Sequence, residues 1–413
     1  ITSVEYTTTK QITHTPEAEG MITWNPDNRS IVYVSERDGH YALYEASIGR
    51  KDDINFPNAT TVDERPLFSD NAERTYPAHS PDGKQLAFIE DRSKLMVMDV
   101  ATKKVRQLTD GSTYPERDGG FYYVWSPDSR WIAFELTGNG HEPYADVAIV
   151  NTTGTPEVTN ITQSSYFDTH PRWALEGNAI AFGSDRYGMR NHASWGSQED
   201  VMLVFLNQDA YDKYRLSKED YELRKELEKQ QKDDKEKADK AGADKKKGKD
   251  KKKKDDKKDA DADKKDDTKV IKVELDGLRD RMVRVTPMSS ALGDFIVTDD
   301  GETLYFFAKF DDGYDLWKTD LRKRETSMAK KLGYRYRSIQ TDKDGNTLYL
   351  LGSDGLGKMG ISSESIKPIK YSATMKIDPQ TEREYMFDYV KREEAARFYE
   401  TGMHGVDWEA MTG

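Results

Sequence analysis

Six copies of one pattern, a polar turn followed by four consecutive apolar residues, run along the chain and predict its fold. The apolar runs are Ile31–Val34, Leu86–Ile89, Trp131–Phe134, Ala179–Phe182, Leu304–Phe307 and Leu348–Leu351. Most turns contain Pro-Asp-Gly or part of it, in which Pro fixes φ, Asp caps the turn backbone and Gly accepts a positive φ. Apolar runs that do not alternate with polar residues indicate strands buried on both faces.

The spacing of the turns indicates a repeat architecture. Their acidic residues are separated by 55, 46, 48, 124 and 44 residues, at Asp27, Asp82, Asp128, Glu176, Asp300 and Asp344. A third strand follows, as at Leu95–Met98 and Val147–Val150, and a fourth ends in Gln-Leu-Thr or a similar triplet, as at Gln107–Thr109. A period of roughly 40–50 residues with four short strands per unit is typical of a β-propeller. A β-sandwich with coincidental turns is the disfavoured alternative.

The first 13 residues decide the predicted number of blades. Gln11-Ile12-Thr13 has the form of the end of a fourth strand, but no hairpin precedes it. We therefore predict an all-β, seven-bladed propeller whose first blade is incomplete, in a chain cut from something longer. The alternative is a six-bladed ring in which residues 1–13 close the last blade. It is less favoured because Ile366–Ile369 can already supply a fourth strand there.

The longest spacing contains a charged insertion that starts near Asp209, between the third and fourth strands of one blade. Ser217-Lys218-Glu219-Asp220 predicts the capped start of a helix. Residues 232–267 hold 16 Lys and 13 acidic residues, with only Ala and Gly otherwise. We therefore expect a disordered insertion at 212–268 within a propeller domain that spans 1–374. A tolerated loop is the preferred interpretation, and an electrostatic tether for a partner is the alternative.

Composition restricts the partners. The net charge is -12 over 413 residues, and without residues 232–267 it is -15, from 47 basic and 62 acidic residues. An acidic body argues against nucleic acid as a partner. No apolar run approaches the length of a membrane span, and the absence of Cys excludes disulfides and thiolate sites. Cytoplasm and periplasm are equally compatible with these features.

The search for chemistry within the chain finds no catalytic constellation. No Gly-x-Ser-x-Gly motif occurs, and the seven His residues lack metal-ligand spacing, so we predict no catalytic residue, metal or cofactor. Gly352–Lys358 has the spacing of a phosphate-binding loop, but Met359 replaces the hydroxyl residue that would hold magnesium. His170, at the entry to an inner strand, could line a channel, although a hydrogen-bonded structural role is the commoner one. Substrate-binding residues stay unassigned.

The last 40 residues depart from the repeat. Asp378-Pro379 is a helix start signal, and apolar residues at positions 386, 387, 390, 395 and 398 approximate a helical stripe. A turn and a second helix are predicted over Met403–Met411. A propeller does not need this tail, so we assign residues 375–413 to the helical opening of a second domain.

This tail carries a family resemblance. Phe398-Tyr399 and then Met403-His404-Gly405-Val406-Asp407-Trp408, placed after a TolB-like propeller, resemble the tricorn-type serine peptidases and their bacterial homologues. The resemblance covers essentially the whole chain, with the Lys/Asp insertion as a departure. It implies a seven-bladed propeller, a first core domain, a PDZ domain and a second core domain that carries the nucleophile. The catalytic residues would then follow Gly413, and His404 would be a structural residue of the inter-helix turn.

The resemblance also implies a function. The parent protein would be a serine endopeptidase that degrades oligopeptides, and this chain alone would be inactive. The propeller would act as channel and filter for peptide or unfolded polypeptide, in a parent that is cytoplasmic and could be homo-oligomeric. Two other classes stay open: a stand-alone TolB-like protein-interaction propeller, and a propeller enzyme such as a lyase or glycosidase with a site at the channel mouth.

Overall fold

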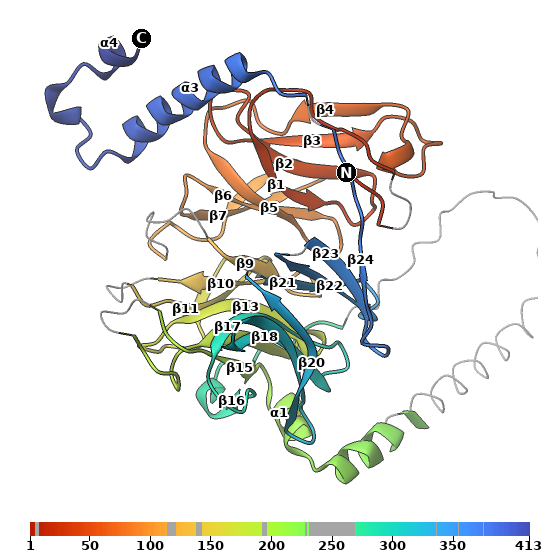
Figure 1. Ribbon diagram of the computed structural model, residues 1–413. Helices are drawn as coiled ribbons and strands as arrows, with labels where there is room; N and C mark the ends of the chain where they lie inside the picture. The colour runs from red at the N-terminus through yellow and green to blue at the C-terminus, as the bar shows by residue number, and fades with distance from the viewer. Residues whose placement is uncertain are drawn as a thin grey trace, which may run out of the picture.

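The structure is a computed structural model that describes the chain except residues 5–7, 114–120, 138–142, 192–195, 228, 231–268, 336, 354 and 375. The described residues form six antiparallel sheets of four strands, arranged as the blades of a propeller (Figure 1). Each sheet uses four strands that are consecutive in the sequence, so no strand is exchanged between blades. The predicted β-propeller is confirmed.

The strands of each blade follow in chain order. Blades 1 and 2 consist of β1 (Glu19–Trp24), β2 (Ser30–Ser35), β3 (Ala42–Ile48), β4 (Val62–Pro66), β5 (Arg74–His79), β6 (Gln85–Glu90), β7 (Lys94–Asp99) and β8 (Val105–Gln107). Blades 3 and 4 consist of β9 (Tyr123–Trp125), β10 (Trp131–Leu136), β11 (Asp146–Asn151), β12 (Val158–Asn160), β13 (Asp168–Ala174), β14 (Ala179–Ser184), β15 (Asp200–Phe205) and β16 (Met282–Arg284). Blades 5 and 6 consist of β17 (Ala291–Val297), β18 (Thr303–Asp311), β19 (Gly313–Asp320), β20 (Glu325–Tyr334), β21 (Arg337–Thr341), β22 (Thr347–Gly352), β23 (Gly355–Gly360) and β24 (Ile366–Pro368).

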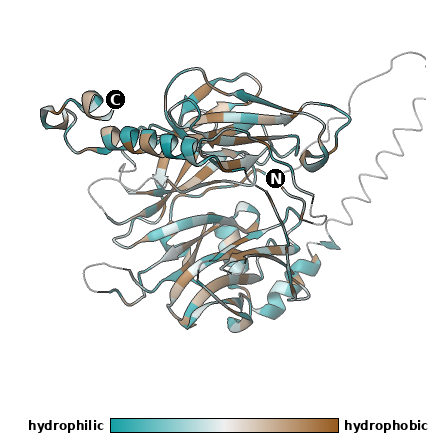
Figure 2. Ribbon diagram, turned by 45° about the horizontal axis from the view of Figure 1, so that its top comes forward, coloured by the Kyte–Doolittle hydropathy of each residue, from teal (hydrophilic) through white to brown (hydrophobic). Residues whose placement is uncertain are grey.

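The second strand of each blade is apolar on both faces because it lies between two neighbouring blades. In β10, Ile132 and Phe134 pack in a cluster shared with blade 2, whereas Ala133 packs in a cluster shared with blade 4. All three side chains are fully buried. Further clusters join blades 1 and 2, 4 and 5, and 5 and 6, and Figure 2 shows hydrophobic residues along the strands. Since buried apolar area contributes about 25 cal/mol per Å², these clusters are the main source of stability.

The structure corrects the preferred number of blades. Its described residues form six blades, as in the alternative interpretation, and none of the described residues in 1–13 belongs to a blade sheet. Ile1 and Lys10 instead exchange hydrogen bonds, and Thr2 bridges Thr9. A fourth strand needs a third strand to pair with, so without one this segment satisfies its own backbone groups. It does not close blade 6 either, because β24 supplies that fourth strand, as the sequence predicted.

The junction between blades 6 and 1 differs from the other five. Among the residues that the structure describes, no hydrophobic cluster is shared by these two blades. The face of blade 1 at this junction packs against Ile1 and Ile12 of the N-terminal segment. Thr9 Oγ1 donates a hydrogen bond to the backbone oxygen of Ser372, which follows blade 6, at 3.1 Å. This hydrogen bond joins the segments that flank blades 1 and 6.

Indole side chains near the ends of two first strands link blade 3 to blade 2 and blade 4 to blade 3. Trp125 Nε1 donates to the backbone oxygen of Ala78 in blade 2 at 3.0 Å, and Trp173 Nε1 donates to that of Val124 in blade 3 at 3.2 Å. Trp24 holds the same place in blade 1, where it is 43% exposed and makes no such bond to any described residue. The difference again marks the junction between blades 6 and 1.

Helices lie outside the blades. The insertion between β15 and β16 starts with α1 (Gln208–Arg215), and residues 218–227 are also helical. The predicted cap of this second segment is confirmed, because Ser217 Oγ accepts a hydrogen bond from the Asp220 N–H at 3.1 Å. The Lys/Asp tract lies outside the described residues. Short 3-10 turns are η1 (Phe56–Asn58), η2 (Leu175–Gly177) and η4 (Leu278–Arg281).

The C-terminal tail is helical, as predicted. Helix α3 (Pro379–Arg397) begins at Asp378, whose side chain accepts from the N–H groups of Gln380 and Thr381. The turn η5 (Met403–Gly405) and helix α4 (Trp408–Thr412) follow. The predicted apolar stripe of α3 is not buried: Met386, Phe387 and Val390 are more than half exposed.

His79 stands in blade 2 where blades 1, 3 and 4 have Trp, and it yields a testable prediction. Both of its ring nitrogens are buried without a hydrogen-bond partner, and burial lowers the pKa of the imidazole from its usual 6.5. The unfolded chain protonates this ring more readily than the folded chain, so its contribution to stability is lost as the pH falls below 6.5. We expect His79→Phe to raise the free energy of unfolding by about 1 kcal/mol at neutral pH, measured by urea denaturation.

The pH dependence of His79→Phe and the variant Trp125→Phe serve as controls for this prediction. The gain of His79→Phe over the native chain should increase at about pH 5.5, because only the native chain then loses stability through this ring. Trp125→Phe, which removes the bond to Ala78, should be destabilised at both pH values. A constant difference between His79→Phe and the native chain across this range would contradict the assignment of a neutral buried ring.

Candidate functional site

Bulges recur in the first strands, which surround the central channel of a propeller. The pairing of the first and second strands shifts at Gly20/Thr23 in β1, Thr75/Ala78 in β5, Thr169/Arg172 in β13 and Leu292/Phe295 in β17. Within three of these bulges, Met21, Tyr76 and His170 have φ values of 51°, 51° and 53°. Bulges re-aim side chains, and a left-handed non-Gly residue costs conformational energy. The repetition directs attention to the inner strands.

His170, which the sequence singled out, lies in the bulge of β13. The His170 side chain is 63% exposed. The backbone N–H of His170 donates a hydrogen bond to Glu135 Oε1 of blade 3 at 2.7 Å. Its ring nitrogen Nδ1 lies 3.8 Å from the same oxygen, and its ring centroid lies 5.2 Å from that of Tyr122. Burial raises the pKa of Glu135, while the hydrogen bond and charge of His170 oppose that rise. Glu135 thus holds the strained backbone of His170 in place.

A second set of polar contacts joins blades 4, 5 and 6. Arg172 Nη2 lies 2.8 Å from both carboxylate oxygens of Asp294. Asp294 Oδ2 also accepts from the N–H of Ile339 at 2.8 Å and from Ser338 Oγ at 3.1 Å. Arg337 reaches back from blade 6 to the backbone oxygen of Leu292 at 3.2 Å. Asp294 is therefore the shared acceptor that aligns three first strands.

Tyr122 connects the two sets. Burial raises the pKa of the Tyr122 hydroxyl, and the negative charges of Asp294 and Glu135 raise this pKa further. The positive charge of Arg172, and the hydrogen bond between Arg172 and the hydroxyl, lower it. We call this group the inner-strand network; it consists of Tyr122, Glu135, His170, Arg172, Asp294 and Ser338. It runs from blade 3 to blade 6 and places one exposed imidazole among side chains that are mostly buried.

The network is suited to positioning rather than to bond cleavage. Ser338 Oγ donates to a carboxylate and has no His base beside it, and the carboxylates of Glu135 and Asp294 already accept protein hydrogen bonds. No group of three or more His, Asp or Glu side chains within the described residues could hold a metal ion. The imidazole of His170 is the exposed group of the network, with its side chain 63% exposed.

Sequence reasoning found His170 but missed its partners. A signal existed, because Arg172 follows His170-Pro171 and Glu135 directly follows the apolar run of β10. It could not be used, because Asp294 lies 122 residues from Arg172 and only the packing of blade 4 against blade 5 brings them together.

The other two sequence candidates have structural surroundings. His404 lies in η5, where Nε2 contacts the Tyr399 hydroxyl and the His404 N–H donates to Glu400 Oε2 at 2.7 Å. Gly352 and Gly355 of the phosphate-loop spacing are opposite each other in the antiparallel pair of β22 and β23. A strand, not a helix, therefore follows this turn, so the structure offers no helix N-terminus for a phosphate.

Comparison with known proteins identifies similar parts. The family description "Tricorn protease C1 domain" matches residues 379–413, which contain α3 and α4. A crystal structure of the tricorn protease matches with a TM-score of 0.62 and 11% sequence identity, over 94% of this chain and 34% of that one. The predicted resemblance to tricorn-type peptidases is confirmed. This chain spans about a third of that structure, and at such identity the structural match shows the shared fold.

Other propellers are also similar. An oligogalacturonate lyase in complex with manganese matches with a TM-score of 0.52 and 13% identity, over 86% of this chain and 78% of that one. TolB from Acinetobacter baumannii matches with a TM-score of 0.44 and 14% identity, over 83% and 61%. At 13% identity the lyase match shows the fold alone. In the described part of the chain, no helix is long and apolar enough to cross a membrane.

The inner-strand network makes a testable prediction about stability. Asp294→Ala leaves Arg172 without its carboxylate and the Ile339 N–H without its acceptor. Because both groups are largely buried, we expect a loss of about 2–4 kcal/mol in the free energy of unfolding. Asp91→Asn is the control, since Asp91 and Lys94 form an exposed pair at 2.8 Å and the change should cost less than about 0.5 kcal/mol. Equal effects of the two substitutions in chemical denaturation would contradict the role of Asp294.

Proposed function

We propose that this chain is the propeller portion, with the opening of the first core domain, of a tricorn-like serine endopeptidase that degrades oligopeptides. The observation that carries the proposal is the order of parts: a propeller similar to part of the tricorn protease leads directly into a segment that matches the C1 domain. On this reading, residues 1–374 are the propeller, with 212–268 as its charged insertion, and residues 375–413 begin the core domain.

The propeller serves as the route by which peptide or unfolded polypeptide reaches an enclosed active site. An extended chain passes along the axis, whereas a folded protein is too wide to enter. The inner-strand network supports this role, because it fixes four first strands beside the axis without committing a nucleophile. The exposed His170 then contacts the passing chain without cleaving it.

The peptidase chemistry is supplied by residues beyond this chain. Among the described residues, neither His170 nor His404 has a Ser or Thr hydroxyl as a hydrogen-bond partner. A serine peptidase needs such a nucleophile and base within hydrogen-bond reach. We therefore propose that the nucleophile of the parent peptidase lies outside the described residues of this chain.

Intact mass and active-site labelling test the peptidase proposal. The native gene product should have a mass well above 100 kDa, since the similar structure is about three times as long as this chain. That product should react with a serine-directed phosphonate, and the isolated 413-residue chain should not. A native product near 47 kDa, or labelling of a Ser within this chain, would contradict the proposal. The first of these outcomes would favour a TolB-like interaction propeller.

The channel role can be tested with a single thiol, because the chain has no Cys. His170→Cys in the full-length protein should remain active until a bulky polymer-maleimide is attached, which should then slow cleavage of long peptides at least about fivefold. Arg65→Cys is the matched control, since Arg65 lies on the outer strand β4 with its side chain 66% exposed. Equal inhibition of the two labelled variants would contradict the proposal that peptides pass His170 in the channel.

A further inference from the structure

A cavity of about 370 Å³ lies between the outer strands of blades 4 and 5. The fourth strand of blade 4, β16, has three residues, whereas the fourth strand of blade 5, β20, has ten. One side of the cavity is formed by β16 and the residues after it, and the other side by the β19–β20 hairpin. Tyr214 of α1 completes the lining. Sites for small molecules in proteins have volumes of roughly 300–1,000 Å³, so this cavity is large enough for a small ligand.

Tyr214 is held in one position beside the cavity. Its ring packs against Phe205, with 4.8 Å between the ring centroids, and its backbone oxygen accepts a hydrogen bond from Arg322 Nη1 at 2.9 Å. Tyr214 is buried, and none of the described residues is hydrogen-bonded to its hydroxyl. Burial raises the pKa of this hydroxyl, and the positive charges of Arg324 and Arg322 oppose the rise. The hydroxyl is therefore protonated at neutral pH and can donate to a ligand.

Most of the other polar groups in the lining already have partners. Arg284 pairs with Asp200 at 2.8 Å, and Thr286 Oγ1 donates to Asp200 Oδ1 at 2.7 Å. The hydroxyls of Thr319 and Thr326 share a hydrogen bond at 2.7 Å. These four lining residues therefore have little capacity to bind a charged ligand.

Arg324 is the cation of the lining whose charge is not neutralised. No ion pair joins it to an acidic residue in the described part of the chain, and no acidic residue lines the cavity. The rest of the lining is apolar, from Val283, Val285, Pro287 and Leu321. A guanidinium and a hydroxyl that can both donate beside an apolar surface are suited to a carboxylate attached to a hydrocarbon group.

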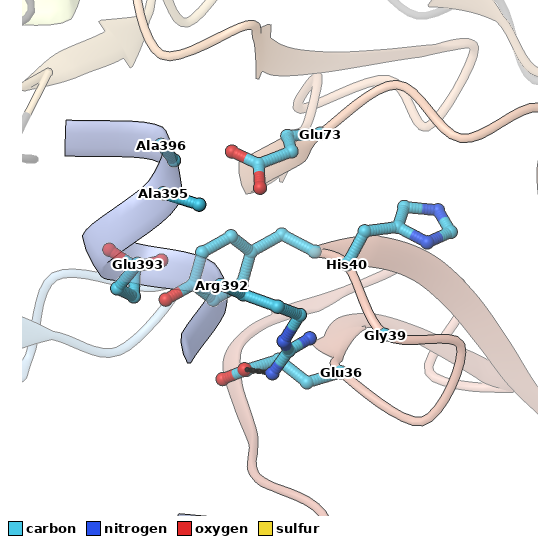
Figure 3. Close-up of a pocket in the computed structure, with 9 residues that line it drawn as sticks. Glu36, Gly39, His40, Glu73, Arg392, Glu393, Ala395 and Ala396 are labelled. Carbon is cyan, nitrogen blue, oxygen red and sulfur yellow. Dashed lines mark hydrogen bonds and ion pairs between the residues drawn. The ribbon is translucent and has the colours of Figure 1, made fainter. Parts of the chain in front are cut away.

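The cavity beside α3 has the opposite character (Figure 3). Its volume of about 420 Å³ is similar, but Glu36, Glu73 and Glu393 contribute to its lining. Arg392 in this lining already donates to Glu36 at 3.0 Å. Burial and the negative charge of Glu393 raise the pKa of Glu73, as expected where carboxylates lie near one another. Charge, rather than volume, therefore distinguishes the two cavities, and an anion is favoured only between blades 4 and 5.

We infer that the cavity between blades 4 and 5 binds a small ligand that carries a carboxylate on an apolar group. The carboxylate accepts hydrogen bonds from Arg324 and from the Tyr214 hydroxyl, and the apolar group lies against Val283 and Leu321. A free short-chain carboxylic acid and the last residue of a peptide share this chemistry. The inference does not depend on the proposed peptidase function, because the cavity lies at outer strands and not at the inner-strand network.

An NMR titration of the 413-residue chain with 4-methylpentanoate tests the inference. This acid should bind at least about tenfold more tightly than 4-methylpentanamide, which has the same hydrocarbon group without the charge. Arg324→Gln should weaken binding of the acid roughly tenfold, and Tyr214→Phe roughly threefold. Lys323→Gln is the matched control, because Lys323 lies in the same turn but pairs with Asp320 at 3.3 Å and does not line the cavity.

Three results would overturn the inference. They are equal affinity for the acid and the amide, unchanged binding in Arg324→Gln, and an equal loss of binding in Arg324→Gln and Lys323→Gln. Arg324 is exposed, so its substitution leaves folding intact and these results are interpretable. Weaker binding in Glu73→Gln would place the ligand beside α3 and would also contradict the inference.

Peptides distinguish the two sources of the carboxylate. If Gly-Gly-Leu binds as tightly as the acid and loses binding on C-terminal amidation, the site accepts the end of a peptide. If the acid alone binds, the site is specific for a free carboxylic acid.

Discussion

The packing of apolar second strands between neighbouring sheets is the interaction on which the rest of this structure depends. A single four-stranded sheet with apolar residues on both faces cannot bury them alone, so each blade needs a neighbour on either side. Ile132 and Phe134 face one neighbour and Ala133 the other. The indole bonds of Trp125 and Trp173 and the ion pair of Arg172 with Asp294 form only because this packing places adjacent first strands side by side.

The same constraint explains the character of the junction between blades 6 and 1. Where no hydrophobic cluster joins two blades, polar contacts and short segments have to do so. Ile1 and Ile12 of the N-terminal segment pack against blade 1, and Arg392 of α3 donates to Glu36. Polar contacts of this kind respond to salt and charge, whereas the buried clusters of the other junctions do not.

The chemistry of the inner strands suggests different roles for the propeller and the C-terminal tail. The polar groups of the inner-strand network satisfy one another across blades 3 to 6, and within the described residues of this network Ser338 donates to a carboxylate. The proposed peptidase function places catalysis in another domain, and residues 379–413 match the C1 domain of the tricorn protease. The axial wall and the tail are therefore complementary parts of the proposed peptidase.

The sequence by itself determined the propeller repeats, the turns, the capped helices and the family resemblance, but not the number of blades. These depend on local patterns: an apolar run after Pro-Asp-Gly, Ser217 three residues before Asp220, Asp378 before Pro379. Only the tertiary structure decided how residues 1–13 pair, which side chains surround His170, and which face of α3 meets the propeller. Each of these is a contact between residues far apart in the chain, such as Arg172 with Asp294 or Glu36 with Arg392. Their pairing follows from how blades and helix pack against one another in space, which no local pattern encodes.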